Sequence, residues 1–443
     1  MKRSGGVARF QLAVKRCKDK MEYRTTRLEN GVRIATREMP EMKSVSVGIW
    51  IAVGGRHEPE ELCGISHFLE HLLFKGTSKR SGRDITEEVE GLGGFINAFT
   101  TEDHTCIYAK AASQHFPTLA NVLTDMYVDS LFEEHEIERE RDVIREEILM
   151  YKDQPGQFSQ DLLTEAMWPR HALGRPLTGS VESISRIQRE HLLQFVAENY
   201  NGNSTVVTVA GRCKHEEVVR QFKTKLKKLP HGRTPSFQRW NEIKRDQRVL
   251  VAEDKTEQTH LALGYHAMSR TDDRRHATKL LSVILGENMS SRLFQQLRER
   301  YAYCYSVHSG TLALEDSGLV SISVGLDSEK LRSALRAIHR ELDKLCRRPP
   351  SRKELRQAQE YTIGQNELGL ESTSNQIMWM GESLLAYDKV VDPDEVQAKF
   401  KEVTAEQIQE VANLWFAPQR MGLAIVGPVD TTKVKRWVGD IGF

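Results

Sequence analysis

The segment HFLEH, residues 67–71, carries two histidines four positions apart and a glutamate directly before the second histidine. On a helix, residues four apart project from the same face, so His67 and His71 can offer two imidazole nitrogens to one zinc ion at about 2.0–2.1 Å. Glu70 lies about a third of a turn away, where it can reach a water molecule at the metal and suits a general base. The alternative is an ordinary helix with two partly exposed histidines. The zinc interpretation requires a third ligand, and glutamate would complete a usual catalytic set.

Candidates for that ligand lie downstream in a strongly charged segment, EEHEIERERDVIREEILMYKD, residues 133–153. Most of its carboxylates are expected on a solvated helix face with salt bridges. Glu140 and Glu147 are two helical turns apart and share one face, whereas Glu146 points about 100° away. One of the pair can ligate zinc while the other orients or neutralises the site from outside. The spacing alone does not rank Glu140 and Glu147.

Helices and strands must position these residues, and hydrophobic periodicity predicts where they lie. In the N-terminal half the expected strands are 44–53, 95–100, 104–112 and 204–210, and the expected helices are 64–75, 84–92, 117–131, 133–153, 156–167 and 182–199. In the C-terminal half the expected strands are 247–253, 259–266, 303–312, 318–325 and 421–426, and the expected helices are 272–286, 290–300, 329–346, 351–369 and 404–415. Because strands and helices interleave while several strands are hairpin-like, each half is expected to be α+β, a mostly antiparallel sheet with helices packed on it.

An internal repeat relates the two halves. When the chain is shifted by 216 residues, Ile187–Gly211 lies over Val403–Gly427 without a gap. Both copies have the pattern of an amphipathic helix, a turn and an apolar strand that ends at glycine. Between the halves, residues 229–246 contain Pro, Gly and charge without periodicity, which is typical of a linker. The predicted organisation is a basic N-terminal tail at 1–23, a zinc-binding domain at 24–228, the linker at 229–246, and a homologous domain without a metal site at 247–443.

Length and composition exclude several classes of protein. With 443 residues, 39% apolar and 28% charged, the chain has the balance of a globular protein of two or three domains. A formal net charge of +1 argues against nucleic acid as a partner, and no apolar run approaches the length of a membrane span. The six cysteines form no CxxC pair, which indicates a reducing compartment. The expected location is the cytoplasm, although the basic tail is also compatible with targeting to an organelle matrix.

Longer stretches of the sequence closely resemble a known family of peptidases. GISHFLEHLLFKGT, residues 64–77, precedes ERDVIREEI, residues 140–148, and HxxEH reverses the HExxH order of thermolysin-like enzymes. These motifs, with GLGGFINAFTTEDHTCIY at 91–108, resemble the inverted zinc peptidases of the pitrilysin/insulinase superfamily. The stretch at 151–184, YKDQPGQFSQDLLTEAMWPRHALGRPLTGSVESI, is most similar to the processing-peptidase subfamily, both its bacterial single-chain members and the β-subunit of the mitochondrial processing peptidase.

The resemblance implies a role for each residue of the candidate catalytic set. It makes His67, His71 and Glu147 the zinc ligands, Glu70 the base that activates water, and Glu140 a supporting carboxylate on the same helix as Glu147. One zinc ion is implied per chain, because no HxxEH motif follows residue 240.

The resemblance also implies residues that contact the substrate. In the second half the family places an Arg and a Tyr seven residues apart, and LRERYAYCYSV supplies Arg298 and Tyr305, the latter expected to stabilise the oxyanion. Within that segment Tyr301 and Ala302 replace the family's Arg and Gly. An extended substrate would add as a strand to the sheet edge at 95–100, where the matching positions are Asn97, Ala98 and Phe99.

The implied function is a zinc-dependent metalloendopeptidase that cleaves unfolded or extended peptides, such as presequence-like segments or signal and propeptide fragments. Each chain would form half of a clamshell, so a homodimer, or a heterodimer with a related subunit, would enclose the peptide in a chamber. The alternative is a non-catalytic structural or partner subunit related to the core proteins of respiratory complexes. Such relatives break the HxxEH set, whereas this chain keeps it.

Overall fold

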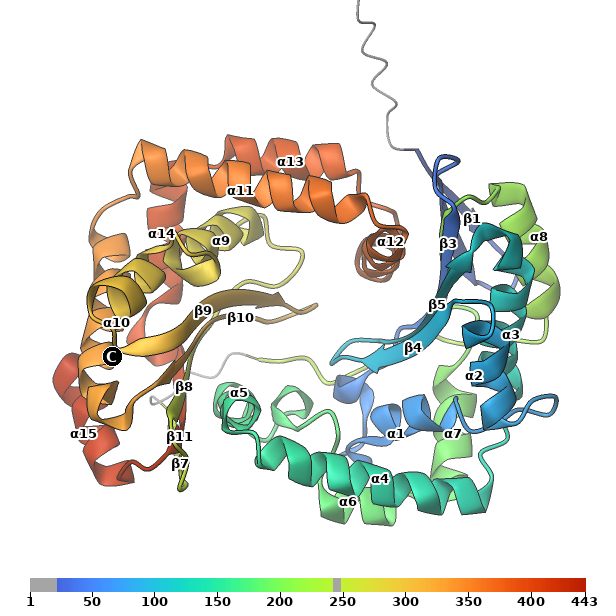
Figure 1. Ribbon diagram of the computed structural model, residues 1–443, viewed down its shortest axis with the longest axis horizontal. Coiled ribbons are helices and arrows are strands. Elements are labelled where there is room, and N and C mark those ends of the chain that lie inside the picture. The colour runs from blue at the N-terminus through green and yellow to red at the C-terminus, as the bar shows by residue number, and fades with distance from the viewer. Residues whose placement is uncertain (1–21, 242–247) are drawn as a thin grey trace, which may run out of the picture.

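The computed structural model describes residues 22–241 and 248–443. Two sheets with attached helices stand opposite one another, and an open edge of each sheet, β4 in one and β9 in the other, points into the space between them (Figure 1). Nearly all of the predicted tail and the end of the predicted linker lie outside the described residues. Within those residues, no helix is both long and apolar enough to cross a membrane.

The first sheet has the strand order β1-β2-β6-β3-β5-β4. All neighbours are antiparallel except β2 and β6, which are parallel. The central strands β3 and β6 are buried along almost their whole length, because helices cover both faces of the sheet. The strands are β1 (Tyr23–Arg27), β2 (Arg33–Glu38), β3 (Ser44–Ile51), β4 (Phe95–Thr100), β5 (Thr105–Ala112) and β6 (Thr205–Gly211).

The second sheet repeats this topology. Its order is β7-β11-β8-β10-β9, with a parallel pair, β7 and β11, and antiparallel pairs elsewhere. Its strands are β7 (Arg248–Glu253), β8 (Thr259–His266), β9 (Cys304–Ala313), β10 (Gly318–Leu326) and β11 (Met421–Gly427). Strand by strand in chain order, β2 to β6 correspond to β7 to β11, so the predicted α+β class with two related, mostly antiparallel sheets is confirmed.

The helices follow the same repeat. α7 and β6 recur as α14 and β11 at an offset of 216 residues, the shift at which the sequence matches itself. The first half contains α1 (Ile65–Leu72), α2 (Gly82–Glu90), α3 (Phe116–Asp129), α4 (Glu134–Lys152), α5 (Pro155–Met167), α6 (Val181–Arg186), α7 (Arg189–Asn199) and α8 (His215–Lys225). The second half contains α9 (Arg275–Ser282), α10 (Leu331–Arg347), α11 (Arg352–Leu370), α12 (Thr373–Tyr387), α13 (Pro393–Glu402), α14 (Ala405–Trp415) and α15 (Thr431–Ile441).

Some expected elements differ from the structure. The helix predicted at 182–199 is broken between α6 and α7, where the Gln188 backbone N–H donates to His191 Nδ1, 3.1 Å away, and starts a new helix. The segments 283–287 and 294–300, expected as parts of α-helices, are π-helical turns. Strands β1 and β2 and helices α8, α12, α13 and α15 were not predicted. In α12 the buried residues include polar side chains and glycine, which conceals the apolar stripe that periodicity detects.

One helix of each half packs on the sheet of the other half. α5, from the first half, lies on β8 and β11, where Gly264 and Gly422 are paired across the strands and leave room for Leu163 and Met167. α12, from the second half, covers β2, β3 and β6, and its Gly381 leaves room for the buried ring of Trp50. This exchange fixes the two sheets relative to one another.

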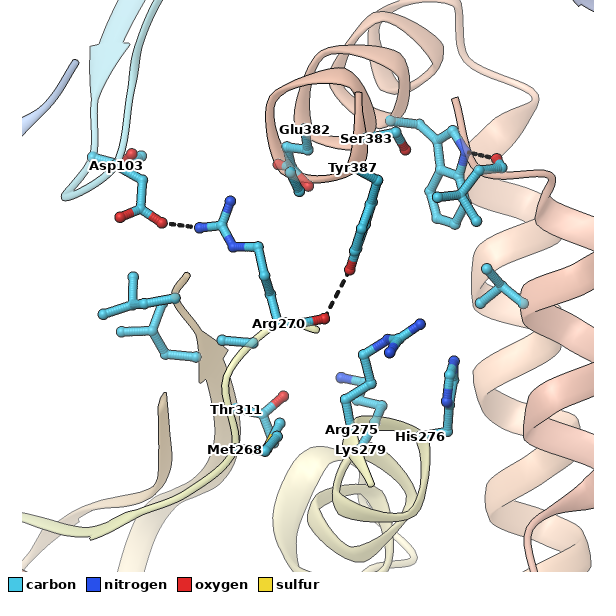
Figure 2. A pocket seen from close by; sticks show the side chains of 18 of the residues that line it. Asp103, Met268, Arg270, Arg275, His276, Lys279, Thr311, Glu382, Ser383 and Tyr387 are labelled. Carbon is cyan, nitrogen blue, oxygen red and sulfur yellow. Dashed lines mark hydrogen bonds and ion pairs between the residues drawn. The ribbon is translucent and has the colours of Figure 1, made fainter. Parts of the chain in front are cut away.

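A buried ion cluster also joins the halves beside a cavity of about 590 Å³. The fully buried guanidinium of Arg56 pairs with Asp103 at 3.0 Å and with Asp316, in the second half, at 2.7 Å. Asp103 also pairs with Arg270, whose backbone carbonyl accepts a 2.9 Å hydrogen bond from Tyr387 (Figure 2). Because breaking a buried ion pair leaves an uncompensated charge, this cluster opposes separation of the halves.

Candidate active site

The short helix α1 carries HFLEH, and its start is determined by a buried carboxylate. Gly64 adopts φ 92° at the N-cap, a left-handed conformation that glycine accepts without strain. Glu58 accepts hydrogen bonds from the backbone N–H groups of Gly64 and Ser66, at 2.7 and 2.9 Å, and so satisfies two of the free donors at the start of the helix. Phe68 and Leu69 are fully buried, which leaves the histidine face of α1 turned toward α4.

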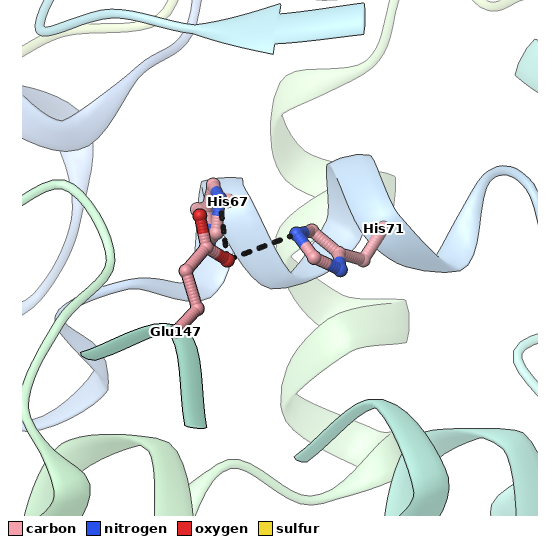
Figure 3. Close-up of side chains that lie close together, drawn as sticks. All are labelled: His67, His71 and Glu147. Carbon is pink, nitrogen blue, oxygen red and sulfur yellow. Dashed lines mark ion pairs between the residues drawn. The ribbon is translucent and has the colours of Figure 1, made fainter. Parts of the chain in front are cut away.

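The structure brings His67 and His71 together with Glu147 of α4 (Figure 3). Glu147 Oε2 lies 3.7 Å from His67 Nε2 and 3.5 Å from His71 Nε2. Ligands at about 2.0–2.1 Å in a tetrahedron stand about 3.3–3.4 Å apart, so small side-chain shifts suffice to bind zinc. Two imidazoles and one carboxylate are also a donor set that zinc prefers. The three residues therefore fit a zinc ion.

Glu140 lies outside this group of three and supports it. One of its carboxylate oxygens is 3.0 Å from His71 Nδ1, and the other is 2.6 Å from Lys75 Nζ. A hydrogen bond from Nδ1–H to a carboxylate orients the ring and leaves Nε2 as the metal-binding atom. Tyr151 donates to Glu147 Oε1 at 2.8 Å, which leaves Oε2 facing the histidines. The geometry thus separates two glutamates that spacing could not rank.

Electrostatics favour a positive charge beside His71 and its two carboxylates but not on His67. Burial, together with the neighbouring His71, lowers the pKa of His67 to about 4. Burial also lowers the pKa of His71, but its interactions with Glu140 and Glu147 outweigh burial and raise that pKa to about 9. The bond with His71 lowers the pKa of Glu147 to about 2. Positive charge is therefore stabilised between His71 and the two carboxylates.

Glu70 belongs to the same helix but points to the sheet edge. Thr100, the last residue of β4, donates a 2.5 Å hydrogen bond from Oγ1 to Glu70 Oε2. Burial raises the pKa of Glu70, while the Thr100 bond opposes that shift. A carboxylate with a raised pKa, held beside the three ligand candidates, is suited to accept a proton and to return it.

Glu70 and the three ligand candidates line a cavity of about 500 Å³. Ala98 and Phe99 of β4 also line it, whereas Asn97 does not and is exposed, its Oδ1 accepting from the Ala98 N–H at 2.8 Å. β4 is the edge strand, paired on one side with β5 and with no described strand on the other. The three positions stay a prediction for substrate binding.

Arg298 and Tyr305 lie together in the second half. The guanidinium carbon of Arg298 is 5.4 Å from the ring centre of Tyr305 and 4.8 Å from that of Phe294, so two rings flank it. Tyr305 is 77% exposed, and neither residue lines the 500 Å³ cavity of the first half. Between them Ala302 has φ 47°, a left-handed conformation. Their contact with the substrate stays a prediction.

Sequence reasoning missed several residues of the cavity wall. Asp161, on the face of α5 opposite the one packed on the second sheet, and Arg175, in the loop before α6, both line the cavity. Both fall within the stretch 151–184 that resembles the processing peptidases. Neither forms a local motif, so only the packing of α5 and of that loop reveals them.

Comparisons with known proteins identify the family of this chain. The family described as Insulinase (Peptidase family M16) matches residues 33–181, and the Peptidase M16 inactive domain matches residues 186–361. The chain belongs to the insulinase family, peptidase family M16. All three ligand candidates lie in the first of these regions.

Relatives extend this similarity over nearly the whole chain. An uncharacterized zinc protease of Streptomyces coelicolor is 35% identical over 97% of this chain and 95% of its own length. YmxG, an uncharacterized zinc protease of Bacillus subtilis, is 35% identical over 90% of this chain and 97% of its own length. A protease from Helicobacter pylori has the same fold, with a TM-score of 0.85, 22% identity and coverage of 92% of this chain and 99% of its own. This M16 chain therefore shares its fold with the Helicobacter pylori protease over nearly the whole length of both chains.

Proposed function

We propose that this M16 protein is a zinc metalloendopeptidase that cleaves unfolded or extended peptides. One observation carries the proposal: Glu70 and the three ligand candidates meet in one cavity beside the open edge strand β4. His67, His71 and Glu147 would hold the zinc. When bound there, a zinc ion supplies Lewis acidity and lowers the pKa of water.

The side chains of the chain itself account for the proton transfers. Glu70 removes a proton from the attacking water and later returns it to the leaving amine. Thr100 holds the carboxylate of Glu70 beside the edge strand, where the scissile bond of an added substrate strand would lie. Glu140 keeps the His71 ring in one tautomer. Tyr305 would approach the oxyanion from the second half.

The cavity also supports a preference for basic residues. Asp161 lies in its wall with Gln157 at 3.2 Å as its side-chain partner, and burial raises the pKa of Asp161. A substrate Arg or Lys near the scissile bond would pair with this carboxylate. This agrees with presequence-like peptides as substrates.

The fold supports a dimer as the working form. The edge strands β4 and β9 both point into the space between the two sheets (Figure 1), and a second chain, identical or related, would enclose that space as a chamber. Such a chamber admits extended peptides and excludes folded proteins. Size-exclusion chromatography with light scattering tests this part of the proposal: a monomer at working concentration would contradict it.

The catalytic proposal is tested with zinc analysis and a quenched Arg-containing peptide, comparing wild type with Glu70→Gln and Glu146→Gln. Glu146 is exposed and makes a matched control on α4. We expect about one zinc per chain in all three proteins, and loss of cleavage in Glu70→Gln alone. A folded protein without zinc, or equal cleavage by Glu70→Gln, would contradict the proposal and favour the non-catalytic subunit.

A further inference from the structure

The catalytic cavity contains one arginine among several carboxylates. Glu102 and Asp161 line it in addition to Glu70 and Glu147. Arg175 is the single Lys or Arg that lines it within the described residues. Arg175 and Thr178 line the cavity together, and the backbone of Thr178 lies against Gly64, the N-cap of α1. Arg175 is therefore near the N-terminal end of that helix.

Most of the hydrogen-bonding capacity of Arg175 is unused. A guanidinium offers five N–H donors, and the hydrogen bond found for Arg175 runs from Nη2 to the backbone carbonyl of Glu58, at 2.8 Å. Its Nε is buried and has no hydrogen-bond partner. Over the ranges 22–241 and 248–443, no carboxylate forms a direct ion pair with it. The Glu58 carboxylate interacts with Arg175 electrostatically, but its oxygens accept hydrogen bonds from the N–H groups of Gly64 and Ser66 at the start of α1.

An unpaired guanidinium in a cavity wall is well suited to recognise an anion. Partial burial removes water from the charge, and the Glu58 carboxylate near it is already bound by the start of α1, so a ligand that pairs directly with Arg175 gains more than at an exposed site. The planar fork of donors matches a carboxylate, which can accept two parallel hydrogen bonds. Peptide substrates carry carboxylates in two places: on acidic side chains and at the C-terminus.

We infer that Arg175 is a specificity-determining residue that binds a carboxylate of the peptide near the scissile bond. The inference rests on the proposed peptidase function and adds a second subsite to the basic-residue subsite at Asp161. Peptides with opposite charges at the two subsites would be preferred over peptides with basic residues alone. The competing account is that Arg175 acts only through Glu58, by holding the loop against the start of α1.

Binding measured without turnover separates these accounts. Zinc-loaded protein with Glu70→Gln is titrated by fluorescence anisotropy with peptides that differ at one position at a time, Glu against Gln, each with an amidated C-terminus. A further Gln peptide with a free C-terminus tests the other source of the carboxylate. The same titrations are repeated after adding Arg175→Met, Arg175→Lys, or Arg347→Met. Arg347 is exposed and pairs with Asp343 at 2.8 Å, so its loss changes the net charge equally.

We expect a carboxylate at one position, either a Glu side chain or a free C-terminus, to tighten binding about 10- to 100-fold. The comparison is with the peptide that has Gln or an amidated C-terminus at the same position. Arg175→Met should abolish this preference and leave amide-peptide affinity and zinc content unchanged. Arg175→Lys should retain part of it, and Arg347→Met all of it. Equal weakening of acidic and amide peptides, or an unchanged preference in Arg175→Met, would overturn the inference while leaving the peptidase proposal intact. Absence of binding for every peptide in the Glu70→Gln protein that keeps Arg175, together with absence of cleavage of every peptide by wild type, would overturn both.

Discussion

Glu140 and Glu147 provide the sharpest test of the metal site, because the two share one helix face and differ only in what they contact. In the structure Glu147 faces both Nε2 atoms, whereas Glu140 accepts from His71 Nδ1 at 3.0 Å and pairs with Lys75 at 2.6 Å. Replacing Glu140 should therefore weaken zinc binding without removing a ligand. Replacing Glu147 should remove a ligand outright.

The size of the Glu140 effect follows from its bonds. A hydrogen bond to a charged group contributes about 1.5–3 kcal/mol and a neutral one about 0.5–1.5 kcal/mol, so Glu140→Gln should lose about 1–1.5 kcal/mol. At 1.4 kcal/mol per tenfold, this is about a 5- to 12-fold loss of zinc affinity. Glu140→Ala also leaves the His71 donor unpaired and should lose about 10- to 100-fold, the usual range for partners of metal ligands.

Competition with a chelator of known affinity measures these values, with Glu146→Gln as the control. At saturating zinc, Glu140→Gln should retain most of its peptide cleavage, because the ligands and Glu70 are unchanged. Glu147→Gln should lose far more zinc affinity than either Glu140 variant. The reasoning would be refuted by equal losses for Glu140→Gln and Glu147→Gln, since Glu140 would then be a ligand itself.

Three other predictions concern stability. Ala302→Gly should raise the free energy of unfolding in urea by about 0.5–1 kcal/mol. Glycine relieves the left-handed strain of about 1–2 kcal/mol at this position, and the greater entropy of glycine in the unfolded chain offsets only part of that gain. A lower free energy of unfolding would contradict the strained conformation. Gly381→Ala should lower the free energy of unfolding by about 1–3 kcal/mol in the same assay, because the added Cβ would lie 2.1 Å from the buried ring of Trp50. An unchanged free energy of unfolding would mean that α12 does not pack on this ring. Burial lowers the pKa of His57 and His104 to about 4, so the unfolded state binds more protons than the folded state below pH 6.5. The contribution of these two histidines to the free energy of unfolding is therefore complete above pH 6.5. It should fall by at most about 1.4 kcal/mol per pH unit and histidine as the pH drops from 6.5 to 4. If His104→Phe leaves the pH dependence of unfolding unchanged, that residue is excluded as a cause.

Local patterns in the sequence determined a large part of this protein. The spacing of His67, Glu70 and His71 depends only on helix geometry, so the helix and its histidine face were predictable. The buried strands β3 and β6 and the repeat that ends at Gly211 and Gly427 were equally evident, because runs of apolar residues and helix periodicity arise within short windows.

The tertiary structure decided which of those residues meet. Glu140 and Glu147 share one helix face, and only the crossing of α4 over α1 distinguishes their roles. The packing of α5 and α12 on the sheets of the opposite halves leaves no trace in local periodicity, and it is α5 that places Asp161 in the catalytic cavity. Arg175 likewise becomes distinctive only where a loop places its charge in a cavity without a carboxylate partner. The physical reason is that helices and strands follow from neighbouring residues, whereas a binding site depends on contacts between segments far apart in the chain.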